Sequence, residues 1–297
     1  MLNRLLYWCV IKPISLLPYP MLYGFSDFLF FIFYYVIPYR KKVVLSNLER
    51  SFPEKRKNEI TAISKAFYRH FCDLVLESLK NFSIKEADAQ KRMEQIDTDV
   101  MNRLHDQGKS VIMVGGHCGN WELWAVATAP HFHHKLVGIY KKLSNPYFDK
   151  KMRDSRSKFG LQMIPTRETA EYIKTHQDEL IAPVIALDQS PGDPKKCVWI
   201  NFLGQDTATH YGAEKFAKEY NYPVVFGHIY KLRRGFYQAR YELVTENPRE
   251  MGYGELIAKV SAILEEDVRK APEHWLWTHK RWKHKRPVQE NFPKSAL

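Results

Sequence analysis

The sequence predicts an α/β protein, in which a mixed, largely parallel sheet is flanked by helices and preceded by a membrane-associated helical segment. From about residue 98 onward, short apolar runs alternate with helical stretches, a pattern typical of parallel strands connected by helices. Before that region, residues 21–37 form an almost continuous apolar and aromatic run. The four cysteines are scattered without regular spacing, which fits a reducing compartment rather than a disulfide framework.

The apolar run in residues 21–37 is slightly shorter than the roughly 20 residues that a membrane-spanning helix needs, and it contains Asp27. Basic residues flank it on both sides: Arg4, Lys12, Arg40, Lys41 and Lys42. This arrangement favours a helix or hairpin at the cytoplasmic leaflet over a buried core helix, although a single span remains an alternative. We therefore expect a membrane-anchoring segment in residues 1–39 and one further domain in residues 40–297.

The remaining elements follow from apolar periodicity. Residues 57–78 predict an amphipathic helix, because apolar side chains recur there at steps of three and four. Strands are expected at residues 110–114, 135–140, 161–164, 181–187, 197–202, 223–230 and 236–244. Helices are expected at residues 119–128, 146–159, 168–176, 212–220 and 254–270.

The stretch VIMVGGHCGNWELW, residues 111–124, is the strongest candidate for a functional site. We expect Gly115 and Gly116 to end a strand and let a substrate approach the main chain, and to leave His117 at the carboxyl edge of the sheet. Asn120 is a favourable N-cap for the next helix, whose first turn contains Glu122. A carboxylate there can hold one ring nitrogen of His117 while the other accepts a proton from an alcohol.

Two other reactive groups are weaker candidates. Cys118 is an unlikely nucleophile because its side chain should point away from the adjacent histidine. The sequence HFHH in residues 131–134 suggests a surface loop rather than a metal site, because no carboxylate or thiolate lies at ligand spacing around it.

The charge balance favours an anionic partner. The chain has 45 Lys and Arg against 33 Asp and Glu, a formal net charge of +12, which suits a phospholipid surface, an acidic protein or a nucleic acid. A nucleic acid is disfavoured because the basic residues are spread along the chain and the apolar N-terminal run would have no role.

Six segments resemble, in order, conserved blocks of the lipid A late acyltransferases, the membrane-bound lauroyl and myristoyl transferases of lipopolysaccharide assembly. They are RKKVVLSNLERSFPE (40–54), GGHCGNWELW (115–124), YKKLSNPYFDKKMRDSR (140–156), LDQSPGD (187–193), FLGQDTATHYG (202–212) and PEHWLWTHKRWKHKRP (272–287). The Phe-Pro-Glu-Gly block of glycerophosphate acyltransferases is missing, which argues against a glycerophosphate acceptor.

The resemblance implies roles for individual residues. His117 would be the general base on the acceptor hydroxyl, with Glu122 as its orienting partner. Arg156 would stabilise an oxyanion or a phosphate. The other substrate-binding candidates are Arg153, Arg167, Asn120, Asp188 and Gln189. Asp188 and Gln189 could equally stabilise a turn, and Trp275, Trp277 and Trp282 could grip lipid headgroups or simply pack.

The activity implied by the resemblance is transfer of a fatty acyl chain from the thioester of acyl carrier protein to a hydroxyl of a lipid A precursor, a phosphorylated glycolipid. It implies no cofactor, contact with inner-membrane phospholipids, and an active site that faces the cytoplasm at the inner membrane. One alternative is an acyltransferase that acts on a lysophospholipid or an amino-acid-containing lipid. Another is a non-catalytic lipid-binding membrane protein.

Overall fold

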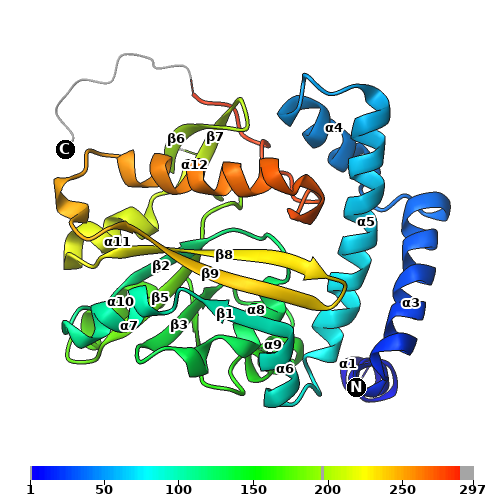
Figure 1. Cartoon of the computed structure of the whole chain (residues 1–297), viewed down its shortest axis with the longest axis horizontal. Helices are drawn as coiled ribbons and strands as arrows, with labels where there is room; N and C mark the ends of the chain where they lie inside the picture. Colours follow the sequence, from blue (N-terminus) through cyan, green and yellow to red (C-terminus); the bar gives the residue numbers. More distant parts are fainter. Residues whose placement is uncertain (1, 195–196, 288–297) are drawn as a thin grey trace.

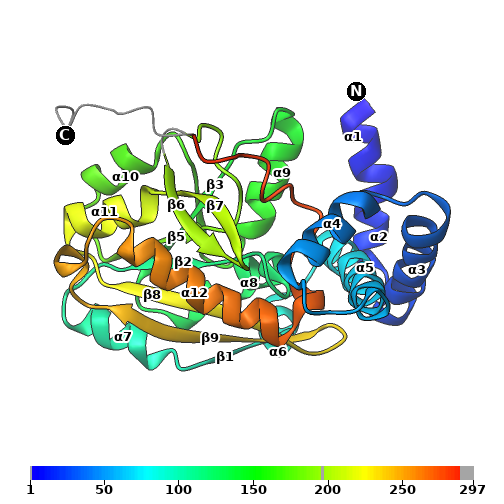
Figure 2. The same ribbon diagram turned by 90° about the horizontal axis from the view of Figure 1, so that it is seen from above.

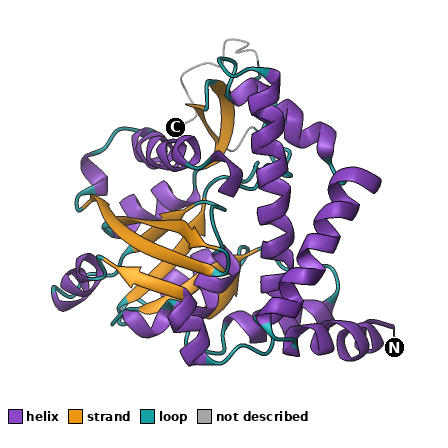
Figure 3. Ribbon diagram, turned by 45° about the vertical axis from the view of Figure 1, so that its right-hand side comes forward, coloured by secondary structure: helices purple, strands orange, loops and turns teal. Residues whose placement is uncertain are grey.

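The computed structural model of the chain describes residues 2–194 and 197–287. The long N-terminal helices stand beside a sheet that has helices on both faces (Figures 1 and 3). The two parts are in direct contact, and the candidate active site lies on the sheet part, close to this junction.

The N-terminus consists of two bent helical segments. The first contains α1 (Leu2–Leu6), η1 (Tyr7–Ile11) and α2 (Lys12–Leu16), and the second contains α3 (Tyr19–Phe31) and η2 (Ile32–Val36). The break falls at Leu17, which is extended, as is usual for a residue that precedes a proline. No single helix of the described residues is long and apolar enough to cross a membrane; the two segments, bent by 118° at the break, meet these criteria only as a pair.

These N-terminal helices expose many apolar side chains. Most of the large apolar side chains that are exposed in the described residues belong to them or to the chain just after them: Leu2, Leu5, Leu6, Trp8, Val10, Leu16, Met21, Phe25, Phe28, Phe31, Tyr35, Val36, Ile37 and Tyr39. Asp27, the carboxylate within the apolar run, forms an ion pair with Arg234 at 2.6 Å. The other face of α3 packs on α5, where Ser26 Oγ donates a hydrogen bond to Asp73 Oδ1 at 2.8 Å.

Two further helices connect this region to the sheet. They are α4 (Lys41–Ser51) and α5 (Lys57–Lys80), and α5 confirms the amphipathic helix predicted at residues 57–78. The Asn47 side chain of α4 donates hydrogen bonds to the carbonyls of Trp277 and His279, both at 3.0 Å. This contact fixes the C-terminal segment against the helical layer.

The main sheet has seven strands in the order β1-β9-β8-β2-β5-β3-β4. Their bounds are β1 (Met93–Ile96), β2 (Ile112–Gly115), β3 (Lys135–Tyr140), β4 (Gln162–Pro165), β5 (Ile181–Ala186), β8 (Val224–Arg233) and β9 (Phe236–Thr245). All neighbouring strands are parallel except the β8–β9 hairpin. The predicted mixed, largely parallel sheet flanked by helices is therefore confirmed.

Alternating residues of β2 supply both faces of the sheet with apolar side chains. Ile112 and Val114 pack in the cluster that includes α10 (Thr169–Thr175), α11 (Gly212–Tyr220) and α12 (Glu255–Lys270). Met113 faces the opposite cluster, which includes α7 (Asp99–Asp106) and α8 (Trp121–Ala127). Figure 2 shows α12 crossing one face of the sheet. Burial on both faces explains why the strand is continuously apolar rather than alternating.

The remaining elements are short. They are α6 (Glu86–Arg92), η3 (Ala129–His131), α9 (Pro146–Arg156), η4 (Pro248–Glu250) and η5 (Pro272–His274). The strand expected at residues 197–202 forms as β6 (Cys197–Phe202), but it pairs with β7 (Gln205–His210) in a separate antiparallel hairpin. The sequence did not indicate β1 or β7, because their sequences MEQI and QDTATH contain few apolar residues.

Candidate active site

The chain leaves the sheet after β2 in a tight turn that carries His117. A Cβ atom on Gly116 would lie 2.5 Å from a methyl carbon of Leu264 on α12, so a side chain there would displace Leu264. Gly119 has a φ of +57°, and a Cβ on it would lie 2.8 Å from the Ile229 carbonyl oxygen. The left-handed residue of this turn is thus Gly119 and neither Gly115 nor Gly116, and Gly116 allows the close approach of α12.

His117 forms its main side-chain contact with Asp188, which follows β5. The two side chains meet at 2.6 Å between Nδ1 and Oδ1, and the backbone N–H of His117 donates to Oδ2 of the same carboxylate at 2.7 Å. Burial raises the pKa of Asp188, but the hydrogen bonds and positive charge of His117 outweigh it and hold the pKa well below its ordinary value. Asp188 is therefore an anionic acceptor, and Nδ1 of His117 carries the proton.

The same contact sets the proton affinity of the imidazole. Burial lowers the pKa of His117, but the Asp188 carboxylate opposes this effect and leaves the pKa raised above its ordinary value. With its proton on Nδ1, neutral His117 presents a lone pair on Nε2, to which the Gln189 amide donates at 3.2 Å. The His117 side chain retains 17% of its exposure. An alcohol that displaced Gln189 would find a proton acceptor whose other nitrogen is fixed.

The C-terminal segment closes around Asp188 from the other side. The indole N–H of Trp275 donates to Oδ2 of Asp188 at 2.8 Å, and Trp275 also forms an isolated antiparallel bridge with Cys118. The Ser190 backbone N–H donates to Nε2 of His279 at 2.9 Å, and burial lowers the pKa of His279 to about 4, so this imidazole remains a neutral acceptor. These contacts immobilise the carboxylate that holds His117.

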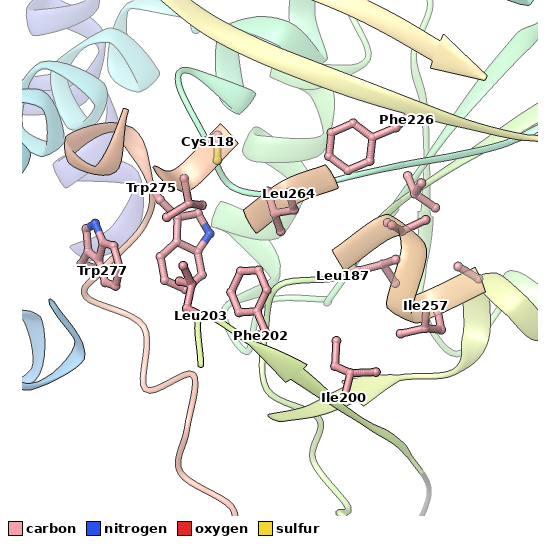
Figure 4. Close-up of a cluster of buried hydrophobic side chains, with 14 of the residues drawn as sticks. Cys118, Leu187, Ile200, Phe202, Leu203, Phe226, Ile257, Leu264, Trp275 and Trp277 are labelled. Carbon is pink, nitrogen blue, oxygen red and sulfur yellow. The ribbon is translucent and has the colours of Figure 1, made fainter. Parts of the chain in front are cut away.

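Trp275 and Trp277 are packing residues rather than a headgroup-binding surface. They are 2% and 0% exposed, and they lie in the buried cluster that also contains Cys118, Phe202 and Leu264 (Figure 4). Trp282 packs against this cluster too, and its indole N–H donates to Thr207. Burial also raises the pKa of the Cys118 thiol well above its ordinary value, which leaves it protonated and unreactive, as expected.

Glu122 does not hold His117. Its carboxylate instead accepts two hydrogen bonds from the Arg156 guanidinium, at 2.9 Å from Nε and 2.6 Å from Nη2. The expected His117–Glu122 hydrogen bond was therefore wrong in its geometry, because Glu122, in the first turn of α8, is directed at α9. Burial lowers the pKa of Arg156, but Glu122 outweighs it and raises the pKa. The pair fixes a permanent cation close to His117.

Asn120 is an N-cap, as predicted, and not a substrate-binding residue. Its Oδ1 accepts the backbone N–H of Leu123 at 2.8 Å, while its Nδ2 donates to Glu77 at 2.6 Å. The residue is 0% exposed. A substrate has no access to it, so this expectation was wrong.

Arg153 and Arg167 are exposed on α9 and after β4. In the described residues neither forms a hydrogen bond or ion pair with His117, Asp188, Glu122 or Arg156. Their proposed contact with substrate remains a prediction.

The histidine-rich loop has a partner that its sequence did not reveal. His133 Nδ1 lies 3.4 Å from Asp106 Oδ1, and His105 Nδ1 lies 3.3 Å from the same atom. The side-chain atoms that could bind a metal ion, one from each of these three residues, lie within 4.8 Å of one another. The cluster lies at the C-terminal ends of α7 and η3, just before β2 and β3 begin. It is therefore at the opposite edge of the sheet from His117 and has no part in the candidate active site.

An imidazole held by a buried carboxylate at the carboxyl edge of a largely parallel sheet defines a site for base-assisted group transfer. Residues 1–284 match the family described as bacterial lipid A biosynthesis acyltransferase, and the chain belongs to this family. Family membership implies an acyltransferase that has an acyl donor and a lipid acceptor. No curated protein matches the chain.

Proposed function

We propose that the chain is a membrane-associated O-acyltransferase that moves a fatty acyl group from the thioester of acyl carrier protein to a hydroxyl of a lipid A precursor. The observation that carries this proposal is the fixed, partly exposed Nε2 of His117, with Asp188 behind it at 2.6 Å. The sequence suggested Glu122 for the orienting role; in this proposal Asp188 takes that role, because its carboxylate contacts His117 and that of Glu122 contacts Arg156.

The reaction balances without a covalent enzyme intermediate. Nε2 of His117 accepts the proton of the acceptor hydroxyl while the hydroxyl oxygen attacks the thioester carbonyl. The resulting oxyanion collapses, the C–S bond breaks, and the thiol of the donor leaves with the proton from the imidazolium. Asp188 stabilises that imidazolium, because an anion next to a newly formed cation lowers the free energy of the charged state.

Arg156 supplies a second contribution in this proposal. Its guanidinium is oriented by Glu122, and a cation fixed in a partly buried site stabilises a developing oxyanion or the phosphate of the acceptor. Arg153 and Arg167 are proposed to contact the same phosphorylated glycolipid.

The surplus of positive charge supports an acidic donor protein. Acyl carrier protein is strongly acidic, and a chain with a net charge of +12 attracts it over distances of about 10 Å at moderate ionic strength. The expected location is the inner membrane, with His117 facing the cytoplasm where the donor is available.

The exposed apolar face of the N-terminal helices supports attachment to inner-membrane phospholipids. Replacing Phe28 and Phe31, which are 64% and 53% exposed, with Glu should reduce binding to anionic phospholipid vesicles. A matched control is Tyr253→Glu, because Tyr253 is 72% exposed but lies outside the N-terminal helices. Equal vesicle binding by the two variants in a sedimentation assay would contradict this mode of attachment.

The proposed function is tested by a deletion strain and by purified protein. The deletion strain should accumulate lipid A that lacks one acyl chain, and the gene for His117→Ala should not restore it. Purified His117→Ala should lose about 10²–10⁴-fold in transfer rate while it remains folded by circular dichroism. Intact lipid A together with altered phospholipids or aminolipids would assign a different acceptor, and no transfer by wild-type protein would support a lipid-binding protein.

A further inference from the structure

A buried carboxylate on α5 lies directly behind the turn that carries His117. Glu77 is 4% exposed and accepts three hydrogen bonds from three different parts of the chain. Asn120 Nδ2 and the Tyr237 hydroxyl donate to Oε2 at 2.6 and 2.7 Å, and the Tyr23 hydroxyl donates to Oε1 at 2.9 Å. Burying a carboxylate is costly unless donors surround it, and each of these donors is itself fixed.

The contact with Asn120 determines the shape of the active-site turn. Because the Asn120 amide is anchored on Glu77, its Oδ1 is directed at the Leu123 N–H and starts α8 at Trp121. One residue earlier, the Gly119 carbonyl accepts a hydrogen bond from Nε2 of His70, again on α5, at 3.1 Å. Burial lowers the pKa of His70 well below its ordinary value, which keeps this imidazole neutral.

Two residues of one helix, His70 and Glu77, thus hold consecutive residues of the turn. His117 is only two residues before Gly119. Near-attack geometry tolerates little displacement, and a shift of about 1 Å in a reacting group can cost about 10²-fold in rate. Both side chains are only 4% exposed, so an effect of the α5 contacts on the reaction would act through the turn.

The third donor connects the turn to the N-terminal helices. Tyr23 is on α3, which packs along α5 and whose opposite face carries the exposed apolar side chains. Figure 1 shows α3 and α5 running side by side, with the sheet on the other side of α5. A single carboxylate thus receives hydrogen bonds from the helix proposed to contact lipid and from the turn proposed to perform the reaction.

We propose that Glu77 is a positioning residue, which fixes the His117 turn through Asn120 and makes its geometry depend, through Tyr23, on the placement of α3. The inference rests on the proposed acyl transfer and extends it by a route from the membrane-facing helix to the reacting groups. Neither Glu77 nor Tyr23 takes part in proton transfer.

The contact between Glu77 and Asn120 is tested by exchanging donor and acceptor. In Asn120→Asp two carboxylates face each other, and kcat should fall by about 10–100-fold while KM for the acyl donor changes little. Glu77→Gln should be nearly silent, since its amide oxygen can replace Oε2 and its N–H can donate to the Tyr23 hydroxyl. The double variant N120D/E77Q restores a donor–acceptor pair and should recover most of the kcat lost in N120D.

The contact with α3 is tested by two matched hydroxyl deletions. Tyr23→Phe removes the donor to Glu77 and should lower kcat several-fold. Tyr68→Phe removes another hydroxyl in a partly buried hydrogen bond, which links α5 to the Tyr39 carbonyl at 2.5 Å but does not contact the turn or Glu77. It should leave kcat unchanged, although both variants lose one bond between α5 and the N-terminal region.

Transfer is measured with the full-length protein in phospholipid vesicles, with acyl carrier protein thioester and a lipid A precursor, at a temperature below the melting point of every variant. If the wild-type protein is active, two results would each overturn the positioning role alone. One is no recovery of kcat in N120D/E77Q, and the other is an equal kcat in Y23F and Y68F. A wild-type protein no more active than His117→Ala would overturn the proposed function and the positioning role together.

Discussion

The end of β5 and the first turn of α8 each bring one carboxylate to the neighbourhood of His117, and their environments differ. Asp188, after β5, has 2% of its side chain exposed and contacts the imidazole. Glu122, in α8, has 14% exposed and contacts the guanidinium of Arg156. Glu122 is five residues from His117 in sequence, whereas Asp188 is 71 residues away, yet the distant residue makes the contact.

Strand adjacency explains this difference. β2 and β5 are parallel neighbours with Gly115 opposite Ala186, and the Leu187 N–H donates to the Gly115 carbonyl at 3.1 Å. The residues just beyond these two strand ends must therefore meet. The helix that follows His117 instead carries Glu122 away toward α9. In the proposed mechanism one carboxylate tunes the base, and the other orients a cation.

The largest expected effect distinguishes these two roles. Asp188→Ala should lower kcat by about 10³-fold or more, because the imidazolium loses its counter-charge and its tautomer is no longer fixed. Glu122→Ala should cost less, since His117 keeps its hydrogen bond. Steady-state kinetics on both purified variants measure this order, with circular dichroism as the control for folding. A greater loss in Glu122→Ala would contradict the assignment.

The second prediction concerns the Glu122–Arg156 pair. Arg156→Ala should lower kcat by about 10²-fold, the usual effect of removing one electrostatic donor from an oxyanion site. If the role of Glu122 is to hold Arg156, then the double variant E122A/R156A should be no slower than R156A. Strictly additive losses in this double-mutant cycle would show that Glu122 acts independently of the arginine.

The third prediction separates the tryptophan that holds Asp188 from its neighbour. Trp275→Phe removes a hydrogen bond to a charged group and should lower the free energy of unfolding by about 1.5–3 kcal/mol; it should also reduce kcat. Trp277→Phe removes a bond to the neutral Pro272 carbonyl and should cost about 0.5–1.5 kcal/mol without an effect on kcat. Urea denaturation and kinetics of the two variants provide the comparison.

The smallest predicted effect is a shift in the pH dependence of kcat/KM. In the proposed mechanism the neutral form of His117 is the base, and Asp188 raises the pKa of this imidazole above its ordinary value of 6.5. The rate should therefore fall as the pH drops through this raised pKa, and the acidic limb should move to lower pH in Asp188→Asn. A profile of kcat/KM against pH measures the shift. An acidic limb at the same pH in both proteins would be inconsistent with the Asp188 contact.

Periodicity and turn residues were sufficient to locate most elements and to place His117 directly after a strand. The strand at residues 135–140 and the helix at residues 212–220 form as predicted, because their apolar patterns and flanking residues are local signals. The same holds for His117, which follows a strand and a glycine pair, and for Asn120 as an N-cap. Each of these predictions depends only on residues within a few positions.

The errors about side-chain partners at the site involve contacts between distant parts of the chain. Nothing in the sequence near Asp188 indicates that β5 lies beside β2. Glu122, which is close to His117 in sequence, was therefore predicted to be the partner of the imidazole. Glu77 is 43 residues from Asn120, and Trp275 lies among basic residues that resemble a surface. The strand at residues 197–202 was recognised, but alternation alone does not specify the sheet to which a strand belongs.

The most direct test of the account is the pKa of the His117 imidazole, measured by ¹⁵N NMR in the wild-type protein, Asp188→Asn and Glu122→Gln. The account predicts a wild-type pKa above the ordinary value, a proton on Nδ1 in the neutral form, and a larger drop in Asp188→Asn than in Glu122→Gln. A larger drop in Glu122→Gln, or a neutral imidazole protonated on Nε2, would contradict the claim that Asp188 holds the base.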